Sequence, residues 1–266
     1  MKMTPKAVCT TGRKYHEESV RLARETAKRL AIPYVERKNE SIQELRRLYG
    51  CETILVAKKG MLLLETLSGE LFFHPNMAHL RIKNLRLGQE DHMVSAMKLE
   101  TGMKVLDCTL GFGADAIVAS YAVGTEGSVT GVEINPCLAE VIRYGMSHVL
   151  AENYDIHAAM RRIRVISADS LDFLRRQQTD AFDVVYFDPM FRHPLMESKS
   201  LAPLREIADH RAVSLEAIEE AKRVARHRVV FKENSRSLEF ERLGFSAFQG
   251  GRYSKIKFGV MELGRS

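Results

Sequence analysis

The segment at residues 105–115 reads V-L-D-C-T-L-G-F-G-A-D, and it constrains the fold more than any other part of the chain. The apolar residues before Asp107 predict a buried strand that ends in an acid. Gly111 and Gly113 predict a tight turn, because glycine adopts backbone torsions that other residues resist. A helix is expected to open directly after this turn. A strand, a glycine turn and a helix in this order are typical of α/β folds that bind a nucleotide-like cofactor.

Strand-like and helix-like segments alternate from Met103 onward, and alternation of this kind indicates a parallel sheet covered on both faces. Strands are predicted at 103–107, 128–133, 163–167, 183–188 and 228–231, and helices at 114–122, 136–150, 170–177 and 214–227. The C-terminal end differs, because residues 245–249 and 255–263 predict two antiparallel strands joined by a tight turn at Gly250-Gly251. The predicted fold class is α/β, a Rossmann-like doubly wound sheet closed by an antiparallel hairpin.

Residues 1–87 predict a separate small α+β domain. Helices are expected at 15–30 and 41–49, a β-hairpin at 53–57 and 61–66, and a further strand at 71–73. A helix over 88–100 is expected to lead into the main domain. The predicted domains are therefore residues 1–87 and residues 88–266.

Positive charge is concentrated near the N-terminus. Residues 1–100 hold 18 Lys and Arg against 12 Asp and Glu, an excess of +6, whereas residues 101–266 hold 22 of each. Two interpretations stay open. In the first, the basic segment binds a polyanion beside a catalytic domain without net charge. In the second, the charged side chains only form solvent-exposed faces of helices.

Several classes of protein are disfavoured by composition. No apolar run approaches the ~20 residues that a membrane helix needs, and the first residues lack the apolar core of a secretory signal. A cytoplasmic protein without membrane association is therefore expected. The four cysteines are scattered without a CxxC pair, and the nine histidines lack metal-ligand spacing, so no metal site is predicted.

The glycine loop is compatible with two cofactors. Its sequence G-F-G-A-D-A matches the dinucleotide fingerprint, and Glu133, 20 residues after Gly113, is placed to accept hydrogen bonds from ribose hydroxyls. Asp107 discriminates between them, because a carboxylate there repels the pyrophosphate of NAD but attracts the ammonium and sulfonium groups of S-adenosylmethionine. Asp115 would likewise be unfavourable near a phosphate and acceptable near an amino acid. The alternative interpretation is structural: Asp107 caps the turn and Asp115 suits a helix N-terminus.

Two further segments follow predicted strands. Asp169-Ser170 lies where this fold commonly contacts adenine, although the pair also suits a helix cap. Asp188-Pro189-Met190-Phe191 follows a near-continuous apolar strand, 81 residues after Asp107. It resembles the D/N-P-P-Y/F motif of methyltransferases that modify base amines. Asp188 and the Pro189 carbonyl would accept N–H hydrogens, and Phe191 would stack on the base.

Lys232 follows the predicted strand 228–231. We interpret it as a surface residue, with the ligand-binding edge of the sheet as the alternative.

These segments together resemble the ribosomal RNA small subunit methyltransferase J family, whose members methylate guanine N2. The resemblance rests on D-x-T-x-G-x-G-x-D-A at 107–116, A-D-S-L at 168–171 and D-V-V-Y-F-D-P-M-F at 183–191. It implies S-adenosylmethionine as cofactor and one set of residues lining its site: Ala114, Asp115, Glu133, Ile134, Asp169, Ser170 and Asp188. The chain departs from the family at Ala114, where the family has arginine, and after Phe191, where it lacks the family's lysines.

The sequence therefore predicts an S-adenosylmethionine-dependent methyltransferase that modifies an exocyclic amine of a base in RNA, held through the basic N-terminal region. The substrate RNA implied by the resemblance is ribosomal. Alternatives are a methyltransferase acting on DNA, protein or a small molecule, and a non-catalytic RNA-binding module. An NAD-dependent oxidoreductase is less favoured, because of Asp107 and the closing hairpin.

Overall fold

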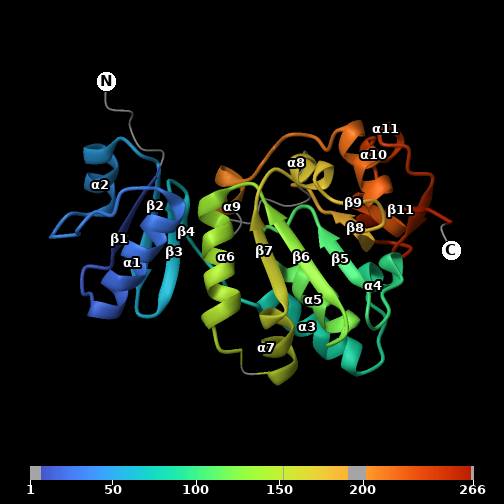
Figure 1. The fold of residues 1–266 in the computed structure, drawn as a ribbon, viewed down its shortest axis with the longest axis horizontal. Coiled ribbons are helices and arrows are strands. Elements are labelled where there is room, and N and C mark those ends of the chain that lie inside the picture. The colour runs from blue at the N-terminus through green and yellow to red at the C-terminus, as the bar shows by residue number, and fades with distance from the viewer. Residues whose placement is uncertain (1–6, 152, 191–201, 265–266) are drawn as a thin grey trace. The chain divides into compact units, whose positions relative to one another are not determined.

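The computed structural model describes residues 7–151, 153–190 and 202–264, which pack as two compact units (Figure 1). Unit 1 comprises residues 1–74, 135–149 and 197–208, and unit 2 comprises residues 75–134, 150–196 and 209–266. Unit 1 therefore takes a helix, α6 (Pro136–His148), from the middle of the chain. The domain boundary predicted between residues 87 and 88 stays a prediction.

Unit 1 is built on a four-stranded sheet in the order β1-β2-β3-β4. The strands are β1 (Ala7–Thr11), β2 (Thr53–Lys58), β3 (Met61–Thr66) and β4 (Gly69–Phe72). β1 runs parallel to β2, and the other pairs are antiparallel. The predicted hairpin and third strand are confirmed. β1 was not predicted, because its five buried residues show no alternation of apolar and polar side chains.

Four helices accompany this sheet: α1 (Glu17–Leu30), α2 (Ile42–Tyr49), α6 and α9 (Ala202–Ile207). α1 packs on β1 and β2, α2 on β2, and α6 on β3. α2 begins where the sequence predicts, because Ser41 and Glu44 form a reciprocal capping box. The side chain of Leu45 then faces a small apolar core that includes Ile54 and Leu63.

Unit 2 is built on a seven-stranded sheet in the order β10-β11-β9-β8-β5-β6-β7. The strands are β5 (Lys104–Asp107), β6 (Ser128–Glu133), β7 (Ile163–Ser167), β8 (Phe182–Phe187), β9 (Ala225–Asn234), β10 (Ala247–Gln249) and β11 (Ile256–Glu262). The pairs among β5 to β9 are parallel, whereas β11 is antiparallel to both β9 and β10. The predicted sheet with its closing antiparallel strands is confirmed.

Helices cover both faces of this sheet. Those of unit 2 are α3 (Asn76–Arg86), α4 (His92–Met97), α5 (Ala114–Val123), α7 (Tyr154–Arg161), α8 (Ser170–Arg175), α10 (Leu215–Val224) and α11 (Glu239–Arg242). α5 packs on β5, β6 and β7, and α3, α4 and α7 pack against α5. α8, α10 and α11 contribute Leu174, Ile218 and Phe240 to a core with buried residues of β8 and β9. The predicted doubly wound arrangement, a mainly parallel sheet with helices on both faces, is therefore confirmed.

Several predicted boundaries are wrong, including that of the strand predicted at 228–231, which as β9 spans Ala225–Asn234. The helix expected over 88–100 is the shorter α4, because the Asp91 side chain accepts hydrogen bonds from two backbone N–H groups and starts the helix at His92. The helix expected over 214–227 ends at Val224, since Ala225 already belongs to β9. The turn at Gly250-Gly251 is longer than expected, since residues 250–255 separate β10 from β11.

Within the part of the chain that the structure describes, no helix combines the length and apolarity needed to cross a membrane.

Gly131 of β6 couples the sheet to the predicted cofactor loop. A Cβ atom at this position would lie 2.4 Å from a terminal carbon of Leu110, far closer than side chains approach one another. Leu110 belongs to the loop, and its backbone N–H donates to the carbonyl of Val132 at 3.0 Å. The absence of a side chain at Gly131 is therefore what lets the loop lie against β6.

We expect Gly131→Ala to lower the free energy of unfolding by about 1–3 kcal/mol, because the added methyl overpacks the contact with Leu110. The variant should also bind S-adenosylmethionine more weakly, since the loop must shift. Urea unfolding and calorimetry measure the two effects. Ser128→Ala, at an exposed position of the same strand, is the control. Wild-type affinity in Gly131→Ala would show that the loop does not depend on this contact.

Candidate active site

The site lies where the strand order of the unit 2 sheet reverses direction. β5 is flanked by β6 on one side and by β8 on the other, so the connections after β5 and β8 diverge at the carboxyl edge of the sheet. Open α/β sheets bind their ligands at such a point. Asp107 ends β5, and Asp188 follows β8 directly. The two acids that the sequence singled out are therefore brought to one edge.

The glycine loop connects β5 to α5. Gly111 and Gly113 have φ values of 49° and 76°, in the left-handed region that favours glycine. The N–H of Gly113 donates to the Leu110 carbonyl at 2.7 Å and closes the turn from which α5 begins at Ala114. The predicted turn is confirmed.

Glu133 holds this loop from the neighbouring strand. Its Oε2 accepts a hydrogen bond from the backbone N–H of Gly111 at 3.1 Å, and its side chain is buried. The Glu133 carbonyl accepts from the N–H of Ala168, which joins the ends of β6 and β7. Ile134 follows Glu133 and is half-buried. Glu133 therefore lies beside the loop, and its predicted contact with ribose hydroxyls stays a prediction.

Asp107 is a buried carboxylic acid with no cation directly bonded to it among the described residues. Its Oδ1 accepts hydrogen bonds from the backbone N–H and the hydroxyl of Thr109, at 3.0 and 3.5 Å. Burial is the main cause that raises the pKa of Asp107 to about 8; the carboxylates Asp115 and Asp188 act in the same direction, and the hydrogen bond from Thr109 opposes them. A cationic ligand at this position would stabilise the ionised form.

Asp115, in the first turn of α5, lies at the centre of an ionic network. Its carboxylate accepts from the guanidinium of Arg81, from the hydroxyl of Tyr186 at 2.7 Å and from the Nζ of Lys232 at 2.9 Å. Burial alone would raise the pKa of Asp115, but Lys232 and Arg81 outweigh it and hold the pKa well below its usual range. Asp115 is therefore ionised at neutral pH.

Asp188 is connected both to this network and to the cofactor loop. Its Oδ2 accepts from Lys232 at 2.7 Å, and its backbone N–H donates to the hydroxyl of Thr109 at 2.6 Å. Burial raises the pKa of Asp188 to about 7; Lys232 opposes this increase, and Asp115 adds to it. Asp188 therefore titrates near neutrality.

The balance of charge at the site is acidic. Asp107, Asp115 and Asp188 face Lys232 and Arg81, and Arg81 also binds the carboxylate of Asp91 at 2.7 and 2.8 Å. Asp91, Asp115 and Asp188 share these two cations, and Asp107 has no cation bonded to it among the described residues. A ligand with positive charge restores the balance, whereas a diphosphate would be repelled. S-adenosylmethionine, with its sulfonium and ammonium groups, fits this set of side chains.

Asp169 and Ser170 lie at the start of α8, directly after β7. The Asp169 carboxylate caps the helix by accepting from two backbone N–H groups, and it accepts from Arg211 at 2.7 Å. Because Ser167 pairs in register with Glu133, both segments end at the same edge of the sheet. The capping role is observed, and the contact with adenine stays a prediction.

The structure adds three residues to those expected. Arg81 lies on α3, a helix that was not predicted. Tyr186 is part of an apolar strand, which gave no reason to expect its hydroxyl at a site. Lys232 was interpreted as a surface residue, and this is wrong: its side chain is 19% exposed and bonded to two carboxylates. Pro189 follows Asp188 as expected, whereas Phe191 lies outside the described residues.

The chain resembles known methyltransferases. Residues 45–244 match the family described as "Putative SAM-dependent methyltransferase". The protein YpiP of Bacillus subtilis (strain 168) is 37% identical over 253 residues, covering 95% of this chain and 98% of YpiP. Ribosomal RNA small subunit methyltransferase J of Pseudomonas fluorescens (strain Pf0-1) is 28% identical over 166 residues, covering 60% of this chain and 62% of that enzyme. The resemblance drawn from the motifs is thereby confirmed.

A solved structure shares the fold over almost its whole length. The crystal structure of a SAM-dependent methyltransferase from Neisseria gonorrhoeae superimposes with a TM-score of 0.63 and 17% sequence identity, covering 97% of this chain and 96% of the other. The architecture expected from the sequence is therefore found in an experimental structure.

We expect Asp107→Asn to flatten the pH dependence of folding stability between pH 5 and 8. The folded wild type retains a proton on Asp107 up to about pH 8, whereas an unfolded aspartate loses its proton near pH ~4. The free energy of unfolding of the wild type should therefore fall, relative to the variant, by about 1 kcal/mol per pH unit as pH rises. Urea unfolding at four pH values measures this. Parallel pH profiles for the two proteins would contradict the buried, protonated state.

Proposed function

The chain belongs to a family of S-adenosylmethionine-dependent methyltransferases, and we propose that it methylates an exocyclic amine of a base in RNA, with guanine N2 as the target. The enzyme class and the cofactor follow from the family, and the base and the RNA are proposals. The base and the RNA are supported by the Asp188-Pro189 segment, which follows β8. The backbone N–H of Asp188 donates to the hydroxyl of Thr109, in the cofactor loop, at 2.6 Å.

Each part of the cofactor has an assigned partner in this proposal. Asp107 and the loop of Gly111 and Gly113 would receive the cationic amino acid end, and Glu133 would accept from the ribose hydroxyls. Asp169 would contact the adenine. When bound, the cofactor supplies a methyl group activated by attachment to a positively charged sulfur. The protein has to align that methyl group with the acceptor nitrogen.

Asp188 would prepare the acceptor amine. The lone pair of an aryl amine is delocalised into its ring, which makes the nitrogen a poor nucleophile. Hydrogen bonds from its N–H groups to the Asp188 carboxylate and the Pro189 carbonyl would localise the lone pair toward the methyl group. Phe191 would stack on the base and orient it. Transfer would form the new N–C bond as the C–S bond of the donor breaks, and the methylated amine would then release its extra proton to solvent.

Lys232 would keep Asp188 able to accept these hydrogen bonds. A protonated carboxyl offers one oxygen fewer as acceptor and adds a donor, so the ionised form is required. Burial favours the neutral acid, and the ammonium at 2.7 Å opposes this. The same ammonium binds Asp115 of α5, which fixes its position.

The choice of RNA rests on relatives. The methyltransferase J enzymes bear a name that specifies small-subunit ribosomal RNA, but the aligned part spans less than two thirds of the Pseudomonas fluorescens enzyme. A base amine in ribosomal RNA, held through the basic N-terminal region, is the substrate that these observations favour. Transfer to DNA, protein or a small molecule is the competing outcome.

We expect transfer of labelled methyl from S-adenosylmethionine to RNA from a strain that lacks this gene, and little transfer to RNA from the parent strain. Asp188→Asn should reduce the rate roughly 10²-fold or more, because the amide replaces one acceptor by a donor. Its cofactor affinity, measured by calorimetry, should stay within a few-fold of wild type. Full activity of Asp188→Asn would exclude the mechanism, and labelling of DNA or protein alone would exclude the RNA substrate.

Lys232→Met should move the acidic limb of the pH–rate profile upward by one pH unit or more, because Asp188 then keeps its proton to higher pH. Lys232→Arg retains the positive charge, so its pH–rate profile should lie close to that of the wild type. Rates at saturating cofactor and RNA, from pH 6 to 9.5, measure the effect. An unshifted profile in a folded Lys232→Met protein would show that Lys232 does not control Asp188.

A further inference from the structure

A second charged site lies in unit 1, where the two parallel strands β1 and β2 end. Arg13 and Lys14 follow β1, while Lys58 ends β2 and Lys59 comes next. The N–H of Gly12 donates to the Ala57 carbonyl at 3.0 Å, so the two strand ends lie side by side. Ligands of α/β sheets bind beyond the carboxyl ends of parallel strands.

These four cations and Arg37 line a cleft of about 600 Å³, which we call the basic cleft. Glu65 and Glu70 are its acidic members, and they pair with each other in register across β3 and β4. Five positive charges thus face two negative ones. The cleft carries a formal excess of three positive charges.

The cations of the basic cleft outnumber its two carboxylates, Glu65 and Glu70. Arg13, Lys14, Lys58 and Lys59 form no ion pair with any residue that the structure describes. Arg37 is buried, and it donates to two backbone carbonyls, those of Glu40 at 3.0 Å and Thr11 at 3.4 Å. Burial and the proximity of Arg13 both lower the pKa of Arg37, against the effect of Glu65 and Glu40. An anion in the cleft would relieve this repulsion.

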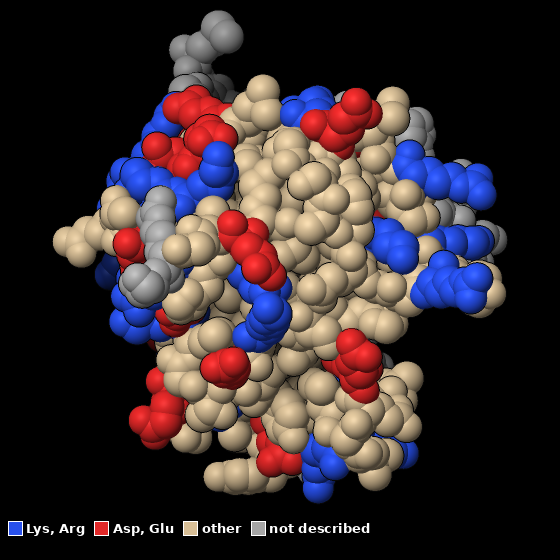
Figure 2. Space-filling view, turned by 90° about the vertical axis from the view of Figure 1, so that its right-hand side faces the viewer, with Lys and Arg blue, Asp and Glu red and all other residues tan. Residues whose placement is uncertain are grey.

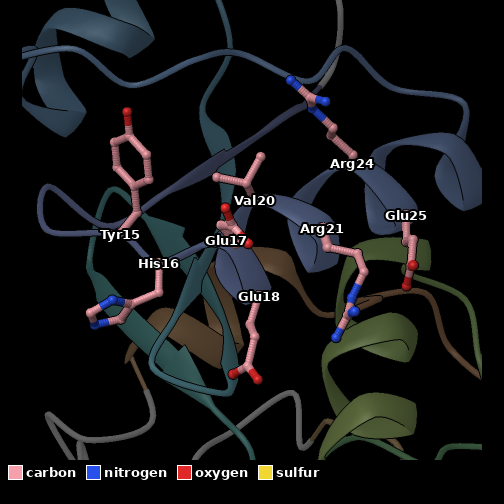
Figure 3. Close-up of a pocket in the computed structure, with 8 residues that line it drawn as sticks. All are labelled: Tyr15, His16, Glu17, Glu18, Val20, Arg21, Arg24 and Glu25. Atoms are coloured by element: carbon pink, nitrogen blue, oxygen red, sulfur yellow. The ribbon is translucent and has the colours of Figure 1, made fainter.

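The hollow along α1 is less suited to a polyanion than the basic cleft. A hollow of about 820 Å³ along α1 is lined by Glu17, Glu18 and Glu25 as well as by Arg21 and Arg24 (Figure 3). Its two arginines point in different directions from the helix, and its glutamates outnumber them. On the face shown in Figure 2, a broad uncharged area separates the basic side chains.

We propose that the basic cleft binds the phosphate backbone of the RNA substrate, an inference that rests on the function proposed above. Backbone phosphates are recognised by lysine and arginine without regard to sequence, and this recognition positions the nucleic acid. The cleft would supply affinity and position, while the site at Asp188 selects the base. It accounts for three of the six excess positive charges in residues 1–100.

The test compares two double variants of the full chain that each lose two positive charges in unit 1. Lys58→Gln/Lys59→Gln removes them from the basic cleft, and Arg21→Gln/Arg24→Gln removes them from the hollow along α1. Binding of a fluorescein-labelled 20-nucleotide single-stranded RNA is measured by anisotropy at several salt concentrations. The cleft variant should bind roughly tenfold more weakly, and its slope of log affinity against log salt should fall by about 1.4. The control should change less than twofold.

Two further measurements separate failure of this inference from failure of the proposed function. Cofactor affinity, measured by calorimetry, should be the same in all three proteins, and methyl transfer to RNA by the cleft variant should show a raised KM with a nearly unchanged kcat. If the wild type methylates RNA but both double variants bind it equally well, the cleft is not the RNA site. If the wild type neither binds nor methylates RNA, the proposed function fails and this inference fails with it.

Discussion

The ion pairs of Lys232 hold the active-site edge of unit 2 together. One ammonium group, 2.7 Å from Asp188 and 2.9 Å from Asp115, connects the strand that carries the proposed catalytic acid with the helix that follows the cofactor loop. Two carboxylates this close to each other in a buried position would repel, and at least one would take a proton. With Lys232 between them, Asp115 is ionised and Asp188 titrates near neutral pH. Without it, neither the charge nor the position of Asp188 would be fixed.

A neutral hydrogen bond complements this ionic contact. Thr109 accepts from the N–H of Asp188 and donates, through its own backbone N–H, to the carboxylate of Asp107. The glycine loop after β5 and the Asp188 segment after β8 are therefore linked through one residue, Thr109. Methyl transfer depends on the alignment of donor and acceptor, and a shared residue limits how far the two loops can move apart. The excess of carboxylates over cations remains uncompensated until a cationic ligand binds.

The two units divide the work in a way that their charges explain. Unit 2 holds the acidic site that suits a cationic cofactor, and unit 1 carries the basic cleft that suits a phosphate backbone. In unit 2 the preference follows from the excess of carboxylates over cations at the site. In unit 1 it follows from Lys58 and Lys59, which form no ion pair with any residue that the structure describes. If the excess carboxylates and the excess cations lay on one surface, they would form ion pairs with each other and bind neither ligand.

Much of the fold could be predicted from the sequence because its signals are local. The alternation of strand-like and helix-like segments predicted the parallel sheet, and the glycines at 111 and 113 predicted the turn before α5. The errors have physical causes. α3 escaped prediction since its sequence has only a weak amphipathic pattern, and the helix at 214–227 was overextended because its last residues suit strand and helix alike. The roles of Glu133 and Asp169 in binding cofactor stay predictions, as does that of Phe191.

The sequence by itself indicated the class of fold, the favoured cofactor and the acids at the ends of β5 and β8, since each depends on residues close together in the chain. Only the tertiary structure decided which charged side chains lie within hydrogen-bond distance of one another. Arg81, Asp115, Tyr186 and Lys232 come from four separate elements, and no spacing in the sequence reveals that they form one network. Electrostatic energy depends on distances in space and on burial, and both are set by the packing of the whole sheet.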